Sequence, residues 1–160
     1  MSEVYLTLLR IGPDLKGDEQ GILKVMEGNF MKAVFATREN DKNLSYSSLR
    51  VGIYEMEHSV KENQLDGTPC DPINCLRPTD LRIKHVLIHR AKNDNPNTLA
   101  GCIAPGSWGK LWGFGGSEAA MEELFVALGG YQKKKKVTLK VLSNATGVGL
   151  ETKDDWWRTK

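Results

Sequence analysis

The sequence predicts a mainly β protein of the α+β class, a small antiparallel β-barrel or sandwich with one helix inserted before the last strand. Short apolar runs with a two-residue alternation recur along most of the chain. Stretches rich in Gly, Asn and Pro separate these runs. Only one segment has the spacing of an amphipathic helix. We expect one β domain over residues 1–142, with its helix at 117–128, and a C-terminal tail over 143–160.

The first half of the chain predicts four strands. Residues 4–11 (VYLTLLRI) alternate β-branched, aromatic and aliphatic side chains as a buried strand does. Residues 22–26 and 30–36 predict a hairpin around Gly28-Asn29. Residues 49–57 (LRVGIYEME) predict a fourth strand. Residues 59–80 hold three of the six prolines and two of the three cysteines without a sustained apolar period, so we expect a long loop there.

The second half predicts a strand, a helix and a last strand. Residues 81–89 (LRIKHVLIH) become wholly apolar toward their end, as a strand entering the core would. The helix over 117–128 has Ser117 as its expected N-cap, apolar residues at helical spacing, and Gly129 as its stop. Residues 137–142 predict the last strand. The lysines at 133–136 are typical of a solvated edge, and the alternative is an anion-binding patch.

Composition excludes several classes of function. A formal charge of +2 argues against nucleic-acid binding. No apolar stretch is long enough to span a membrane. The start, Met1-Ser2-Glu3, lacks the features of a secretory signal, so we expect a cytoplasmic location. In that reducing compartment the three cysteines would be thiols, and the one disulfide we consider is Cys70 with Cys75.

The segment from Val86 to Gly106 holds the candidate catalytic site. His89 lies at the end of an apolar run, and Cys102 follows after a polar loop. A cysteine attacks as the thiolate and needs a base or a positive charge nearby, which His89 or Arg90 could supply. Main-chain amides after Gly101 could hold an oxyanion.

Two less specific interpretations stay open for the same residues. Cys102 could be a small buried apolar residue, with His89 a hydrogen-bonded residue at a strand end. Cys70, Cys75 and Cys102 with His85 or His89 could also form a zinc shell, but only one short ligand pair is present. We expect no metal and no cofactor.

The stretch "LIHRAKNDNPNTLAGCIAPG", followed by a glycine-rich link and a helix, resembles an uncharacterised domain family of phages and bacteria with an I-H-x-x-N loop and a G-C-I segment. "VYLTLLR", "GILKVMEGNFMKAVFATREND" and "SSLRVGIYEM" extend the resemblance over residues 4–142. It implies a phage or bacterial protein of mainly β fold.

The His and Gly-Cys-Ile pattern also resembles the L,D-transpeptidases, which cross-link or trim peptidoglycan through a cysteine acyl-enzyme. Ala100 stands where that family usually has a histidine, so His89 would have to act as the base from upstream.

Three functions follow as expectations. The first is a cysteine enzyme acting on peptidoglycan peptides by acyl transfer or hydrolysis. Cys102 would be its nucleophile, His89 its base, and Asn93 or Asp94 would orient the imidazole or a substrate amide. Arg90, Gly101 and Trp108 are the expected substrate-binding residues.

The second is a non-catalytic virion or assembly protein that contacts other virion proteins, and the third is a zinc-stapled module. Trp156 and Trp157 in the tail could mediate contact with a partner or a second copy. The expected location is the host cytoplasm, with packaging into a virion an alternative.

Overall fold

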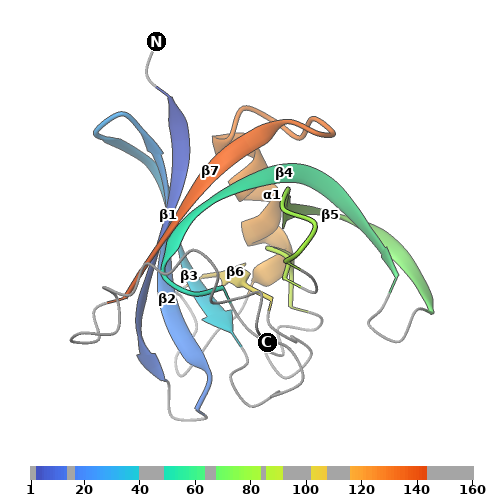
Figure 1. Cartoon of the computed structure of the whole chain (residues 1–160), viewed down its shortest axis with the longest axis horizontal. Helices are drawn as coiled ribbons and strands as arrows, with labels where there is room; N and C mark the ends of the chain where they lie inside the picture. Colours follow the sequence, from blue (N-terminus) through green and yellow to red (C-terminus); the bar gives the residue numbers. More distant parts are fainter. Residues whose placement is uncertain are drawn as a thin grey trace.

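The described part of the chain folds as one curled seven-stranded sheet that packs against one helix. The structure is a computed structural model that describes residues 3–13, 17–39, 49–63, 68–83, 86–91, 102–107 and 116–143. The elements are β1 (Val4–Pro13), β2 (Glu19–Glu27), β3 (Phe30–Glu39), β4 (Gly52–Asn63), β5 (Pro69–Pro78), β6 (Ala104–Gly106), α1 (Ser117–Ala127) and β7 (Lys136–Ser143). The predicted class, mainly β with one helix before the last strand, is confirmed (Figure 1).

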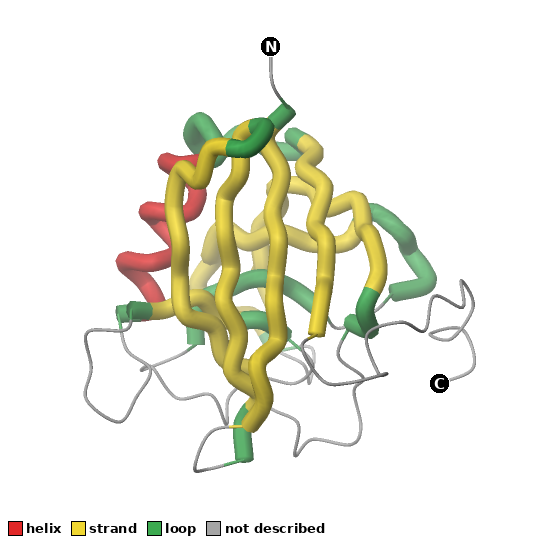
Figure 2. The backbone as a smooth tube through the Cα atoms, turned by 90° about the vertical axis from the view of Figure 1, so that its left-hand side faces the viewer, coloured by secondary structure: helices red, strands yellow, loops and turns green. Residues whose placement is uncertain are grey.

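The strand order in the sheet is β5-β4-β7-β1-β2-β3-β6. All neighbouring strands are antiparallel except β1 and β7, which run parallel with Leu6 beside Leu139. The predicted hairpin is β2 and β3, joined at Gly28, whose φ of 59° suits a glycine. Figure 2 shows the tall strands of this sheet with the helix along one side.

The core lies between the concave face of the sheet and α1. Alternate residues of each strand point inward, among them Leu6 and Leu8 of β1 and Leu139 and Val141 of β7, all fully buried. Helix α1 and its C-cap residue add four large side chains to this core, Met121, Leu124, Phe125 and Leu128. Because fully burying one such side chain contributes about 1.5–3 kcal/mol, this shared core holds the helix against the sheet.

The ends of α1 follow from its flanking residues. The predicted N-cap Ser117 is wrong, because Gly116 occupies that position in a left-handed conformation and Ser117 is the first helical residue. At the other end the Gly129 and Gly130 N–H groups donate to the carbonyls of Val126 and Phe125. This is the Schellman arrangement, and it confirms Gly129 as the stop.

Two segments differ from the sequence-based expectation. Residues 59–80 are not a long loop, because they contain the end of β4 and all of β5. Strand β5 lies at an edge of the sheet, where prolines are tolerated and one face stays polar, so the apolar period is missing. The strand predicted over residues 81–89 is wrong in the part that the structure describes, because residues 81–83 lie in a turn and residues 86–89 pair only through single bridges of Ile88.

These single-residue pairs join the two edges of the sheet. Ile88 pairs antiparallel with Leu76 of β5 and parallel with Ile103, the residue before β6. Four main-chain hydrogen bonds of 2.8–3.1 Å make the connection. Residues 86–91, which we name the closing segment, therefore complete the barrel wall between β5 and β6.

A buried ion pair lies on the inner face of the sheet. The Arg10 guanidinium donates to both carboxylate oxygens of Glu39, at 2.7 and 2.8 Å. The side chain of Glu39 is 1% exposed and that of Arg10 is 12% exposed.

None of the helices in the described ranges has the length and apolar character needed to cross a membrane.

Candidate functional site

The closing segment brings the two predicted catalytic residues into the same part of the barrel wall. His89 follows Ile88, and Cys102 precedes Ile103, the partner of Ile88. The N–H of His89 donates to the carbonyl of Ile103 at 3.1 Å, which fixes its backbone. Because side chains alternate along paired segments, His89 and Cys102 both point to the face opposite Ile88 and Ile103.

The imidazole of His89 is buried and engaged with the main chain. The residue is 4% exposed, and its Nδ1 lies 2.6 Å from the carbonyl oxygen of Arg90. A carbonyl only accepts, so Nδ1 donates, and the lone pair of the neutral ring is on Nε2. Burial and the nearby Lys61 charge lower the pKa of His89 from 6.5 to about 4, although its hydrogen bond to Arg90 works in the opposite direction.

This environment makes His89 a weak base. An imidazole with a pKa of about 4 is almost entirely neutral at pH 7 and holds a proton weakly. A general base works best when its pKa lies near the operating pH. The local environment of His89 therefore suits a neutral structural ring better than a general base.

Cys102 lies in a small apolar cluster. It is 6% exposed and packs with Ala91 and Ala104, against which Leu87 also packs. Thiolate chemistry needs a polar, partly exposed surrounding. The position of Cys102 thus resembles that of a buried structural cysteine, although its predicted role as nucleophile stays a prediction.

Arg90 borders a separate hollow at the start of α1. This cavity, of about 440 Å³, is lined by Arg90, Ala91, Gly116, Ser117, Glu118, Ala119 and Glu122. The Ser117 hydroxyl donates to the carbonyl of Pro105 at 2.7 Å and accepts from the N–H of Ala91 at 2.9 Å. It therefore joins the helix, β6 and the closing segment.

The other predicted site residues lie outside the described residues. These are Asn93, Asp94, Gly101 and Trp108, together with Trp156 and Trp157 of the tail.

Cys75 is a buried thiol that sequence reasoning placed in a loop. It lies on β5 next to Leu76, so the pairing of Leu76 with Ile88 sets Cys75 opposite His89. Cys75 is fully buried, and burial raises the pKa of its thiol to about 11. Such a group stays protonated at neutral pH and is a poor nucleophile.

The cysteines are free thiols. Cys70 and Cys75 lie five positions apart on the same extended strand, which separates them by roughly 16 Å, so the disulfide considered from the sequence cannot form. Among the residues that the structure describes, no three His, Cys, Asp or Glu side chains are grouped as metal ligands would be.

A second cavity, which sequence reasoning missed, lies near the C-terminal end of α1 and the start of β7. It has a volume of about 390 Å³ and is lined by Glu3, Val4, Glu55, His58, Leu128, Lys135, Lys136, Val137 and Thr138. His58, from β4, is 1% exposed and stands against the rings of Phe125 and Tyr131. In the sequence, the lysines at 133–136 were the feature that pointed to this cavity.

Comparisons with known proteins add no relative. A scan against protein-family models finds no match, and searches of curated proteins and of solved structures find no significant similarity to the chain. The resemblances to the phage and bacterial domain family and to the L,D-transpeptidases therefore stay predictions.

Proposed function

We propose that the protein acts by binding, as a non-catalytic structural or assembly protein of a virion, and not as a cysteine enzyme. The burial of His89 and Cys102 in the barrel closure carries this proposal. His89 is hydrogen-bonded to the chain through its ring and its backbone, and Cys102 packs among alanines. Both residues then contribute to the wall of the barrel, where a small thiol and a neutral ring are suitable.

Exposed apolar side chains on the strands support a binding role. Phe30, at the tip of the hairpin of β2 and β3, is 68% exposed, and Ile53 on β4 is 72% exposed. Leu142 on β7 is 48% exposed. Apolar side chains on the outside of a sheet are suited to contact with another protein, such as another virion component.

Incubation with purified peptidoglycan tests the proposal. The wild type, Cys102→Ala and Cys70→Ser are incubated separately, and the soluble products are separated and identified by mass spectrometry. We expect no released peptides from any of the three. Release by the wild type and Cys70→Ser, but not by Cys102→Ala, would establish the cysteine enzyme instead.

The cysteine enzyme is kept as the second candidate function because one observation favours it. The closure places the backbones of His89 and Cys102 on two paired segments, within one residue of the Ile88–Ile103 bridge. Its substrate would then be peptidoglycan peptides, and the enzyme would reach them either inside the host cell or as a component of the virion.

A further inference from the structure

The outer face of the sheet carries a row of aliphatic side chains that crosses three strands. Leu142 of β7 lies beside Leu9 of β1, and Leu9 lies opposite Ile22 of β2. Their neighbours along the strands, such as Leu8 and Leu23, are buried in the core, so these three side chains point away from it. We name Leu142, Leu9 and Ile22 the outer row.

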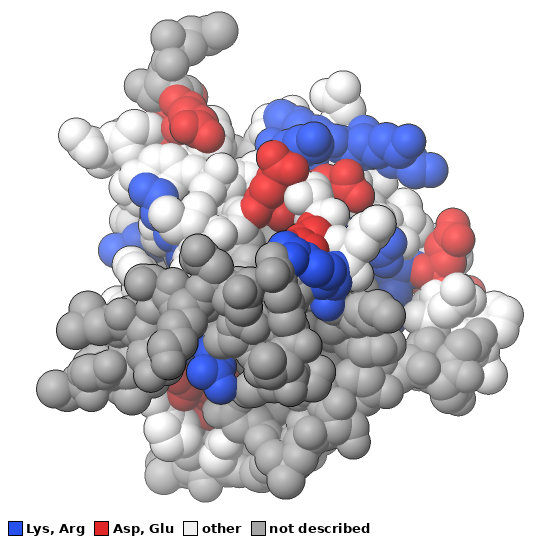
Figure 3. Space-filling model, in the orientation of Figure 1, with Lys and Arg blue, Asp and Glu red and all other residues white. Residues whose placement is uncertain are grey.

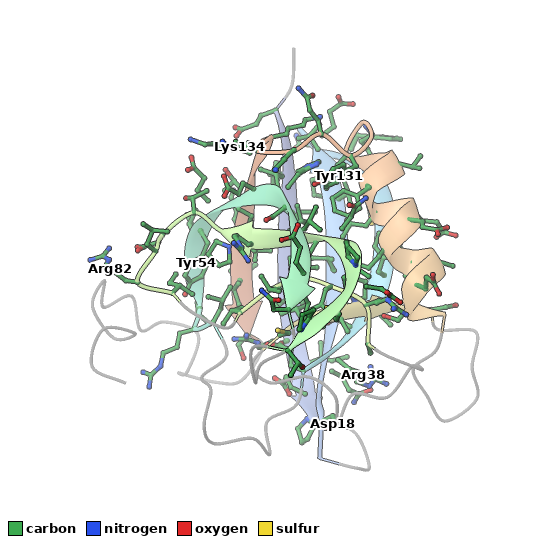
Figure 4. All side chains as sticks on the ribbon, turned by 90° about the vertical axis from the view of Figure 1, so that its right-hand side faces the viewer. Asp18, Arg38, Tyr54, Arg82, Tyr131 and Lys134 are labelled. Carbon is green, nitrogen blue, oxygen red and sulfur yellow. The ribbon has the colours of Figure 1, made fainter. Side chains whose placement is uncertain are left out.

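No helix in the described ranges covers this face. In Figure 2 the outer face of β1 and β2 is turned toward the viewer, and α1 does not cross it. Figure 4 shows the opposite side, where β4, β5 and α1, with Tyr54 and Tyr131 labelled, lie nearer the viewer than β1 and β2. The inner face of these strands is therefore packed, whereas every member of the outer row is partly exposed and Leu142 is 48% exposed.

Two lysines lie beside the outer row. In the next row of the sheet, Lys140 of β7 and Lys24 of β2 flank Thr7 of β1. Ile53 of β4 pairs with Lys140 and Val34 of β3 pairs with Lys24, so apolar side chains continue on both sides. In Figure 3 the middle of the left-hand side, over β1 and β2, carries blue side chains among white ones. Where the described strands pair, these two rows thus combine apolar surface with positive charge and hold no acidic residue.

The side chain of Lys140 leaves the outer row open. Its Nζ lies over the ring of Tyr5, 4.7 Å from the ring centroid. Tyr5 precedes Thr7 on β1, whereas Leu9 of the outer row follows Thr7, so the lysine leans away from the outer row. A segment that packs on the outer row would therefore bury apolar surface without displacing this cation–π contact.

The C-terminal tail has a composition that complements this face. It begins at Ser143, next to the outer row on β7, and its remaining residues lie outside the described residues. Its sequence places Asp154 and Asp155 directly before Trp156 and Trp157. Each indole ring can bury about 150–250 Å² of surface. The aromatic pair suits the aliphatic outer row, and the acidic pair suits the two lysines beside it.

The tail is attached close enough to reach the outer row. Trp156 follows Ser143 by 13 residues. A chain of that length can span up to about 43 Å. The outer row crosses two strand spacings, which is only about 10 Å. Because a tethered segment meets its site at an effective concentration that is typically millimolar, modest contacts are enough to hold it there.

A second copy of the chain fits this face less well. In a two-fold pair the same surface of each copy meets the other. The two lysines would then face lysines, with no acidic side chain of either row to offset them. The charges therefore favour the tail as the occupant.

We propose that the C-terminal tail docks on the outer row through Trp156 and Trp157, with its two aspartates near the two lysines. The docked tail would cover Leu142 and the neighbouring Ile53, two of the exposed side chains that support the proposed binding role. A partner that uses this face would then have to displace the tail. The inference goes beyond the proposed function, because it concerns the chain with no partner bound.

Nuclear magnetic resonance of methyl groups in the full chain tests this inference, because an indole ring packed against a methyl group shifts its signal. The wild type is compared with the double variant Trp156→Ala/Trp157→Ala, which leaves the β domain intact. We expect the methyl signals of Leu9, Ile22 and Leu142 to shift between the two proteins. This readout does not depend on whether the protein binds virion components or cleaves peptidoglycan.

Two exposed residues away from the outer row serve as internal controls. Leu81 lies in the turn after β5, and Val126 lies on α1. Their methyl signals should be the same in the wild type and in the double variant.

Charge variants test the role of the two lysines. Lys24→Glu and Lys140→Glu should each lower the ratio of docked to undocked tail by about two- to fivefold, since an exposed ion pair is weak. The outer-row signals would then move part of the way toward their positions in the double variant. Lys136→Glu, at the other end of β7, is the matched control and should leave the signals unchanged.

Three results would overturn the inference. The first is a set of outer-row signals that are the same in the wild type and the double variant. The second is a difference between them that disappears on dilution, which would mean that the face binds another copy of the chain. The third is an equal effect of Lys136→Glu and Lys24→Glu, which would mean general attraction to positive charge and no site.

Discussion

The hydroxyl of Ser117 should be one of the most important polar groups for stability in this chain. It is fully buried and bonds at once to the Ala91 N–H and the Pro105 carbonyl. Ser117→Ala leaves both main-chain groups buried without this partner, at about 1–3 kcal/mol each. Alanine has a higher helix propensity than serine, which offsets this loss of stability by a few tenths of a kcal/mol. We therefore expect the free energy of unfolding to fall by about 2–5 kcal/mol.

Urea denaturation followed by far-UV circular dichroism measures this loss, and thermal unfolding should show a Tm lower by roughly 5–20 °C. Hydrogen exchange at the Ala91 amide should accelerate in the same variant, because that N–H loses its acceptor. Ser59→Ala is the control, since Ser59 is a half-buried serine on β4. A loss in Ser117→Ala no larger than in Ser59→Ala would refute the reasoning.

Three further predictions concern His89, the buried ion pair and the turn at Lys134. In the folded chain the pKa of His89 is about 4, whereas in the unfolded chain it is 6.5. The unfolded chain therefore takes up the proton first as the pH falls. The free energy of unfolding should drop between pH 6.5 and 4 by up to about 3 kcal/mol. The free energy of unfolding, measured by urea denaturation at several pH values in this range, should change less with pH in His89→Gln than in the wild type. An equal pH dependence in the two proteins would contradict the account. Glu39→Gln should lower the free energy of unfolding by about 3 kcal/mol, and adding Arg10→Met should recover part of it, as a double-mutant cycle would show. Lys134→Gly should raise that free energy by about 1 kcal/mol in urea titrations, because glycine relieves the positive φ, and a loss of stability would argue against strain there.

Local patterns predicted the parts of the fold in which one face of an element is buried. Leu6 and Leu8 alternate with half-buried neighbours, so the period of two for β1 was visible in the sequence. The helix was visible because Leu124, Phe125 and Leu128 share its inner face. β5 was missed because it is an edge strand with prolines and polar side chains, which alone look like a loop.

The candidate site depended on contacts that local patterns do not encode. The spacing of His89 and Cys102 allowed contact between them, but it did not show that both are buried in the barrel wall. Burial depends on the pairing of Ile88 with two segments distant in sequence, Leu76 and Ile103. The same holds for His58, which no sequence pattern singled out and which packs against Phe125 and Tyr131.

The central claim is that Cys102 is a buried wall residue and not a polarised nucleophile. Labelling of the folded protein with a small thiol reagent between pH 6 and 9, with the modified peptides quantified by mass spectrometry, tests it most directly. The account predicts that Cys70, the more exposed thiol, reacts first, and that Cys102 is labelled at a useful rate only after unfolding in urea. Rapid labelling of Cys102 in the folded protein below pH 7, abolished by His89→Ala, would contradict it.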